Sequence, residues 1–272
     1  MSVGRALVLA GARPEPDAAA AYAGVAHKGL IELDGQPLLA RVIAALRGAG
    51  VEAVAVSANE PQVVALAEAL GAEVLPAEAG PSLSALRGIE QLGPPVLLTT
   101  SDHALLQSEW IARFIADAPA VDVCVLLARR EVVEAAAPST KRTYLKFADH
   151  EWSGCNLFLV RTERGVAAIE LWRSIEADRK RPWRIIRRLG PLTLLRYLMG
   201  RLTLADALER LSRLCGASVA AVPTPFGLAA VDVDKPADLD LVRAVVDREA
   251  AGGSANSPTS ARLGEGRAPD SA

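Results

Sequence analysis

Short apolar runs alternate with amphipathic segments of about ten residues along most of the chain. The runs predict buried strands at Ala6–Ala10, Val51–Ser57, Glu73–Leu75, Val96–Thr100 and Val121–Ala128. The segments between them predict helices at Leu38–Leu46, Pro61–Leu70 and Leu83–Leu92. Such alternation is typical of βαβ units. The sequence therefore predicts an α/β fold, with a mostly parallel central sheet and helices on both of its faces.

Four loops follow predicted strands, and they begin at Gly11, Ser57, Gly80 and Ser101. In open parallel sheets, ligands bind beyond the carboxyl ends of the strands. We therefore expect these loops to gather on one edge of the sheet. Ser82 is also in place to cap the helix that begins at Leu83.

The loop after the first strand, Gly11 to Lys28, is rich in small residues, which leave backbone N–H groups open to an anionic phosphate. Arg13 and Lys28 would add positive charge to it. The spacing matches neither a Walker loop nor a dinucleotide-binding fingerprint. The residues alone leave two interpretations open, a phosphate-binding loop and an ordinary flexible loop.

Asp102 follows the strand Val96–Thr100 almost directly. A carboxylate at the carboxyl end of a central strand can hold Mg²⁺ against a triphosphate. It can equally cap the helix that begins near Ser108. Both interpretations stay open on the residues alone.

Asp232 and Asp234 lie near the end of a late apolar run, Ala229–Val233, which predicts another strand. Residues two apart share one face of a strand, so the two carboxylates would point the same way. This arrangement needs a cation or a basic partner nearby. Asp234 could also cap the last helix, which Pro236 is suited to start.

Three stretches together resemble the signature of the MobA-like NTP transferases, the molybdenum-cofactor guanylyltransferase-like members of the nucleotidyltransferases with a GT-A-type fold. They are Leu-Ala-Gly-x-Arg at 9–13 with the downstream Lys28, Asp-Gly-x-Pro-Leu-Leu at 34–39, and Val-Asp-Val-Asp-Lys-Pro-Ala-Asp-Leu at 231–239. The chain departs from the family at Ala12, where a second glycine is usual, and in the spacer between Arg13 and Lys28.

The resemblance implies a Rossmann-like nucleotidyltransferase that uses Mg²⁺. Such an enzyme moves a nucleoside monophosphate from an NTP to a phosphorylated acceptor and releases pyrophosphate. A GT-A glycosyltransferase that uses a nucleotide-sugar, and a non-catalytic nucleotide-binding protein, are the alternatives. The first would need an Asp-x-Asp after a mid-domain strand, whereas the Asp-x-Asp at 232–234 comes late.

Residue roles follow from the same resemblance. Lys28, Arg13 and Asp102 are expected to be catalytic. The metal is expected at Asp102 and Asp234, with Asp232 assisting. Acceptor contacts are expected from Asn156 and Arg184. The nucleotide is expected to contact Leu9, Ala10, Gly11, Ala12, Arg13, Lys28, Gly80, Pro81, Ser82, Ser101 and Asp102.

Residues 161–214 predict a helical insertion, and the stretch 179–201 within it carries eight basic and no acidic residues. Interleaved apolar residues leave three interpretations open. The stretch could lie on an anionic membrane surface, cover a phosphorylated acceptor as a positive lid, or pack on the sheet with its arginines in water. The acceptor expected from this region is a phosphorylated small molecule or a lipid-like one.

Charge, cysteine content and composition bear on the partners, the cellular location and the domain organisation of the protein. A net charge of −2 and a pI of about 6.0 favour no nucleic-acid partner. The chain opens on a strand without a signal segment, and its 3 cysteines have no metal or disulfide spacing, which is typical of a cytoplasmic protein. We expect one nucleotidyltransferase domain over 1–249 and a disordered tail over 250–272. The residues give no indication of the oligomeric state.

Overall fold

The computed structural model of the chain describes residues 3–12, 17–138, 140, 142–177 and 190–250. Except for Ala250, the predicted tail over 250–272 lies outside the described residues, and so do Arg13 and Arg184. Most of the basic residues in the stretch 179–201 also lie outside them. The predicted domain bounds and the predicted insertion therefore stay predictions.

The strands are β1 Arg5–Leu9, β2 Glu32–Leu33, β3 Gln36–Pro37, β4 Ala53–Ser57, β5 Glu73–Leu75, β6 Val96–Thr100, β7 Val123–Arg129, β8 Leu145–Lys146, β9 Glu151–Val160 and β10 Val219–Thr224. The α-helices are α1 Ala18–Ala23, α2 Leu38–Gly48, α3 Pro61–Ala69, α4 Pro81–Leu92, α5 Ser108–Asp117, α6 Arg130–Ala136, α7 Val166–Ala177, α9 Pro191–Leu198, α10 Leu204–Cys215 and α11 Pro236–Ala250. Three 3-10 turns complete the described elements, η1 Lys28–Leu30, η2 Glu163–Gly165 and η3 Gly227–Ala230.

The central sheet has the strand order β10-β7-β9-β6-β1-β4-β5, with β8 paired to β9. Its neighbours run parallel except around β9, which is antiparallel to β6, β7 and β8. The short strands β2 and β3 form a separate hairpin. The predicted mostly parallel α/β sheet is confirmed.

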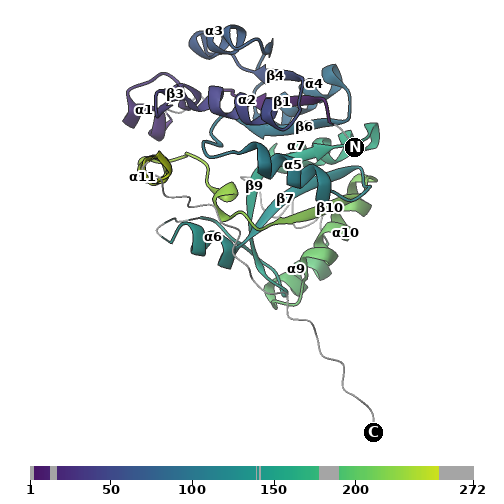
Figure 1. Cartoon of the computed structure of the whole chain (residues 1–272). Coiled ribbons are helices and arrows are strands. Elements are labelled where there is room, and N and C mark those ends of the chain that lie inside the picture. The colour runs from purple at the N-terminus through teal and green to yellow at the C-terminus, as the bar shows by residue number, and fades with distance from the viewer. Residues whose placement is uncertain (1–2, 13–16, 139, 141, 178–189, 251–272) are drawn as a thin grey trace.

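Alternating side chains of β1 divide the core between the two faces of the sheet. Ala6 and Val8 belong to a cluster with apolar residues of α2, α5 and α11, whereas Leu7 and Leu9 belong to a cluster with residues of α4 and α7. Helices therefore cover both faces, as predicted (Figure 1). A Cβ on Gly88 of α4 would lie 2.4 Å from a methyl of Leu7, so glycine lets this helix pack tightly against β1.

Two local predictions are wrong. Helix α4 begins at Pro81 with Gly80 as its N-cap, so Ser82 is not the cap. The run Ala229–Val233 is not a strand but includes the end of the 3-10 turn η3. The residues of this run are buried, and a short apolar run in a sequence indicates burial rather than a particular backbone conformation.

The described part of residues 161–214 is helical. Helix α7 packs against α4, and α10 packs against β10 and α7. Helix α9 instead exposes large apolar side chains, at Leu192, Leu195, Tyr197 and Leu198. No helix among the described residues is both long and apolar enough to cross a bilayer.

Asp122 joins the amino ends of β7 and β10 to the turn after β9. Its carboxylate accepts hydrogen bonds from the Thr162 hydroxyl at 2.6 Å and from the Ser218 N–H and hydroxyl, each at 2.7 Å. These bonds hold the pKa of Asp122 at about 2, below its ordinary value. A depressed carboxylate pKa contributes stability above the unfolded-state pKa, near 4, and the contribution is lost as the pH falls toward 2.

We therefore expect Asp122→Asn to destabilise the protein at pH 7 by about 2 kcal/mol, because hydrogen bonds to a charged acceptor are lost or weakened. The difference from the wild type should shrink steadily between pH 4 and pH 2. Urea denaturation of both proteins across this pH range measures it. A difference that stays constant down to pH 2 would contradict the assignment.

Candidate active site

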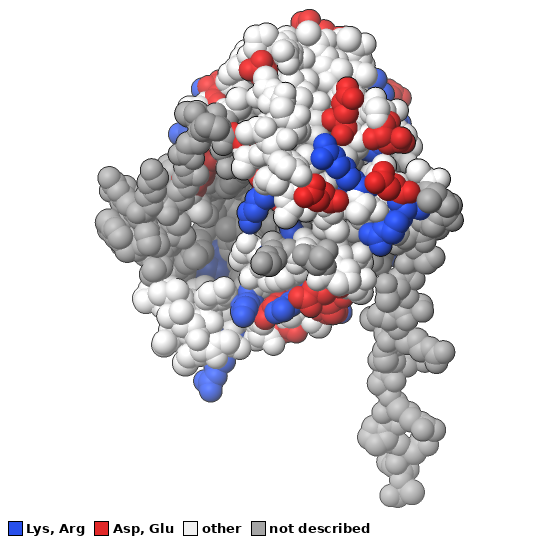
Figure 2. Space-filling view, turned by 90° about the vertical axis from the view of Figure 1, so that its left-hand side faces the viewer, with Lys and Arg blue, Asp and Glu red and all other residues white. Residues whose placement is uncertain are grey.

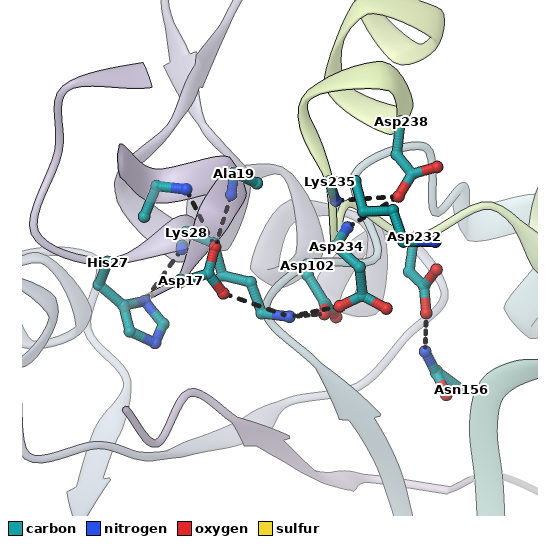
Figure 3. Close-up of polar contacts among 12 residues, drawn as sticks. Asp17, Ala19, His27, Lys28, Asp102, Asn156, Asp232, Asp234, Lys235 and Asp238 are labelled. Atoms are coloured by element: carbon teal, nitrogen blue, oxygen red, sulfur yellow. Dashed lines mark hydrogen bonds and ion pairs between the residues drawn. The ribbon is translucent and has the colours of Figure 1, made fainter. Parts of the chain in front are cut away.

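Lys28 begins η1, at the end of the loop that follows β1. The preceding His27 is the N-cap of η1, and its Nδ1 accepts the Gly29 N–H at 2.9 Å. His27 is also hydrogen-bonded to the backbone of Gly11. Burial keeps the pKa of this imidazole below its ordinary value, so the ring is neutral at pH 7. His27 thus ties the two ends of the loop together and sets the position of Lys28. Figure 3 shows its contact with the backbone beside Lys28.

The ammonium of Lys28 lies among three carboxylates. It donates to Asp102 in a short contact and to Asp234 at 3.0 Å, and an oxygen of Asp17 lies 4.0 Å away. Asp17 is itself fixed as the N-cap of α1 by the N–H groups of Ala19 and Ala20. We call Lys28, Asp17, Asp102 and Asp234 the lysine cluster.

Burial is uneven across the lysine cluster. The exposed fraction of the side chain is 18% for Lys28 and 7% for Asp102 but 53% for Asp234. Burial alone would lower the pKa of Lys28, but the charges of Asp102 and Asp234 outweigh it and raise that pKa. Burial likewise disfavours the charged form of Asp102, and Lys28 outweighs it and lowers the pKa of this carboxyl. Both groups are therefore ionised at neutral pH.

Backbone hydrogen bonds bring the strand ends together. The Ala10 N–H donates to Ser57 at 2.9 Å, and the Ser101 N–H donates to Leu9 at 3.0 Å. The Val233 N–H donates to the carbonyl of Asp102 at 3.1 Å, which sets the late segment 232–234 against the end of β6. The predicted gathering of the loops at Gly11, Ser57 and Ser101 on one edge is confirmed. The loop that contains Gly80 leaves the same edge, because β5, which precedes it, is parallel to β4.

Asp232 faces away from Lys28. Its carboxylate accepts from Arg142 in a short contact and from the Asn156 amide at 2.7 Å. Burial raises the pKa of Asp232, and the bond from Arg142 opposes that rise. The two carboxylates of the Asp-x-Asp therefore serve different neighbours (Figure 3).

Asn156 lies at an irregularity of β9. Residues 125 and 127 of β7 pair with residues 158 and 154 of β9, so β9 has extra residues at this point. Asn156 also has a positive φ of 47°, a conformation that asparagine tolerates better than most residues. Bulges of this kind re-aim side chains beside functional sites.

Glu176 of α7 reaches the start of α4. Its carboxylate accepts from the Ser82 N–H at 3.2 Å and from the Ser82 hydroxyl in a short contact. Because an anion at a helix N-terminus is favourable, Glu176 takes the capping role that Ser82 was expected to have. It also lies close to Gly80, where an added Cβ would be 3.4 Å from Glu176 Oε1.

The sequence matches one family model. The sequence fits the model of the MobA-like NTP transferase domain over residues 6–211. The chain belongs to this family. It is therefore a nucleotidyltransferase, and the resemblance drawn from its motifs is confirmed.

Solved structures agree with the family match. A hypothetical transferase from Thermus thermophilus is 32% identical, with a TM-score of 0.77 over 88% of this chain and 100% of that one. CMP:2-keto-3-deoxy-manno-octonic acid synthetase in complex with CTP is 17% identical, with a TM-score of 0.55 over 90% and 99%. The 2-C-methyl-D-erythritol 4-phosphate cytidylyltransferase of Thermus thermophilus is 17% identical, with a TM-score of 0.52 over 91% and 100%. The latter two show the shared fold alone. No curated protein matches the sequence.

The donor set of this transferase fits a magnesium ion. Oδ1 of the buried Asp102 has no hydrogen-bond partner among the described residues. In the lysine cluster, three negative charges and one positive charge leave a net charge of −2. No group of three or more His, Cys, Asp or Glu among the described residues could hold a metal ion. Protein sites for Mg²⁺ commonly use one or two carboxylates and take the remaining ligands from phosphates and water. Asp102 and Asp234 are enough on that basis.

Sequence reasoning missed several residues of this site. They are Asp17, His27, Arg142 and Glu176, which contact Lys28, Gly11, Asp232 and Ser82, respectively. Asp17 had a usable signal, because it precedes an alanine-rich helical run. His103, which the motif analysis left aside, is buried, and burial lowers its pKa to about 4. It is therefore a neutral residue at pH 7.

We expect Lys28→Met to lower the free energy of unfolding by about 3 kcal/mol, because it leaves the buried Asp102 charge without its partner. Adding Asp102→Asn should restore part of this loss, since the second change removes the stranded charge. Urea denaturation of the two single variants and the double variant measures the coupling. Strictly additive effects would contradict a buried Lys28–Asp102 pair.

Proposed function

We propose that the protein transfers a nucleoside monophosphate from an NTP to a phosphorylated acceptor, with Mg²⁺ as cofactor and pyrophosphate as the second product. The observation that carries this proposal is the lysine cluster at the carboxyl ends of β1 and β6. Family membership supports the donor class, because the family is one of NTP transferases.

In this reaction an oxygen of the acceptor phosphate forms a bond to the α-phosphorus of the NTP. The bond from that phosphorus to the bridging oxygen breaks, and its electron pair leaves with pyrophosphate. Such chemistry depends on positioning and charge neutralisation more than on a dedicated base. Lys28, which stays protonated at neutral pH, neutralises charge on the phosphates, and we assign the same role to Arg13.

We make the remaining assignments from the position of each residue along the edge of the sheet. We assign Leu9, Ala10, Gly11, Ala12 and Ser101 to phosphate contacts, because Leu9 ends β1 and the other four lie in the loops that follow β1 and β6. We assign Gly80, Pro81 and Ser82 at the start of α4 to the base and ribose. Asp102 and Asp234 would hold the metal, which supplies positive charge against the triphosphate when bound. We assign Asn156 and Arg184 to the acceptor.

The Mg²⁺ requirement has an electrostatic reason. A triphosphate is strongly anionic, and the lysine cluster has a net charge of −2 when its groups are ionised. The negative charges of the triphosphate and of the lysine cluster repel each other, so a divalent cation between them favours binding. The positive charge of Lys28 is already included in that net charge and therefore does not offset the repulsion.

Asp232 has a different role in this proposal from the one that the motif implies. Both of its oxygens are bonded, one to Arg142 and one to Asn156. We therefore assign Asp232 as a positioning residue for these two side chains rather than as a direct metal ligand.

Pyrophosphate release from ATP, CTP, GTP and UTP, with phosphorylated sugars and polyols as acceptors, tests the proposal. We expect Mg²⁺-dependent release that falls at least a hundredfold in Asp234→Asn and in Lys28→Ala. Asp234 is half-exposed, so its variant should stay folded and keep the test valid if Lys28→Ala is unstable.

Arg87→Gln on the exposed face of α4 is the matched control, since Arg87 pairs only with Glu90 among the described residues. Its turnover should equal that of the wild type. Full turnover in Asp234→Asn and Lys28→Ala would contradict the proposal. Turnover only with nucleotide-sugars would favour glycosyl transfer instead.

A further inference from the structure

A polar cavity adjoins the lysine cluster on its Asp234 side. It has a volume of about 260 Å³ and lies between β9, the segment before β8 and the start of α11. Its described lining residues are Arg142, Thr143, Ser153, Gly154, Asn156, Asp234, Lys235 and Asp238. Asp234 therefore contributes both to this cavity and to the lysine cluster. Of its lining residues, only Asn156 and Asp234 were expected at the site from the sequence.

We propose that this cavity binds the acceptor, and that the acceptor is a small hydroxylated phosphate monoester rather than a lipid. This inference rests on the proposed nucleotidyl transfer. It adds the size and polarity of the acceptor, and it makes Arg142 and Lys235 the residues that recognise the acceptor phosphate.

Size supports a small acceptor. Pockets that hold drug-sized ligands measure roughly 300–1,000 Å³. A cavity of about 260 Å³ lies just below this range. A sugar or polyol phosphate of about ten non-hydrogen atoms is of this size.

Polarity excludes a buried acyl chain. None of the described lining residues is a large apolar one, so a lipid tail would gain no hydrophobic contact inside this cavity. Hydroxyl-bearing and amide side chains, at Thr143, Ser153 and Asn156, line it instead. The Asn156 amide N–H group already bonds Asp232, which leaves its carbonyl oxygen to accept from a ligand hydroxyl.

The described lining carries two positive charges, on Arg142 and Lys235, and two negative charges, on Asp234 and Asp238, and the two cations can pair with a phosphate. Lys235 forms no ion pair with any described residue, whereas the neighbouring carboxylates already have partners. Asp234 is bonded to Lys28, and Asp238 accepts the N–H groups of residues 234 and 235. Arg142 is only 13% exposed and is fixed by Asp232, so its guanidinium is ordered before a ligand arrives. A phosphate ester can bridge these two cations.

Figure 2 shows the distribution of charged side chains on one face of the molecule. On the face that it shows, basic and acidic side chains of the described residues lie next to one another and do not gather by sign.

Gly154 allows a test that changes no charge. It lines the cavity, and a Cβ at this position would have no atom within 4 Å. Gly154→Leu should therefore fill the cavity at little cost in stability. Lys235→Gln removes the cation of Lys235 and keeps a side chain of similar length. Arg87→Gln again serves as the control.

The experiment is calorimetric titration of the full chain with glycerol 3-phosphate. Glycerol serves as the uncharged probe, and phosphatidylcholine vesicles with phosphatidic acid present the same phosphate ester on a lipid. We expect glycerol 3-phosphate to bind, Lys235→Gln to weaken it at least tenfold, Gly154→Leu to abolish it, and Arg87→Gln to leave it unchanged. Glycerol should not bind.

The inference is overturned if glycerol 3-phosphate fails to bind, if Gly154→Leu binds it as well as the wild type does, or if only the vesicles bind. Stabilisation by NTP with Mg²⁺ is measured on the same variants. It should survive in Lys235→Gln and Gly154→Leu. If NTP with Mg²⁺ does not stabilise the wild type, that result contradicts the proposed nucleotidyl transfer instead. The two failures are therefore distinguishable.

Discussion

The buried ion pair between Lys28 and Asp102 is the interaction on which the rest of the site depends. Two charges this far from water are costly unless each has a partner in good geometry. The pair therefore requires the loop after β1 and the end of β6 to meet in one arrangement. His27 fixes that loop from one side, and the hydrogen bond from Val233 to Asp102 fixes the late segment from the other. Because that hydrogen bond holds the segment 232–234 against the end of β6, Asp234 lies beside the pair and accepts a hydrogen bond from Lys28.

This arrangement divides the edge of the sheet into two halves that share Asp234. On one side lie Lys28, Asp102 and the small-residue loop, where we propose that the triphosphate and the cation bind. On the other side Asp232 orders Arg142 and Asn156 along a small polar cavity. An acceptor phosphate in that cavity and an NTP beside Lys28 would approach each other at Asp234. The Asp-x-Asp spacing lets one carboxylate serve each half.

The sequence predicted most of the sheet and three of the four residues of the lysine cluster, because these depend on local signals. Strands β1 and β6 are short apolar runs, Lys28 and Asp234 belong to the family motifs, and Asp102 directly follows the apolar run of β6. The contact between Asp232 and Arg142 could not be predicted, since it joins residues 90 positions apart with no motif for Arg142. The irregularity of β9 at Asn156 and the capping of α4 by Glu176 depend on tertiary packing in the same way. The turn η3 was mistaken for a strand because burial, not backbone geometry, determines an apolar run.

The most direct test of this account is the thermal stability of the protein with each of ATP, CTP, GTP and UTP, with and without Mg²⁺. A ligand that binds only the folded state stabilises it by about 2.7 kcal/mol at a hundredfold excess over its dissociation constant. The account predicts that at least one NTP stabilises the wild type only when Mg²⁺ is present, and that Asp234→Asn loses this gain. If no NTP stabilises the wild type with Mg²⁺, or if Asp234→Asn is stabilised equally, the lysine cluster is not the nucleotide and metal site.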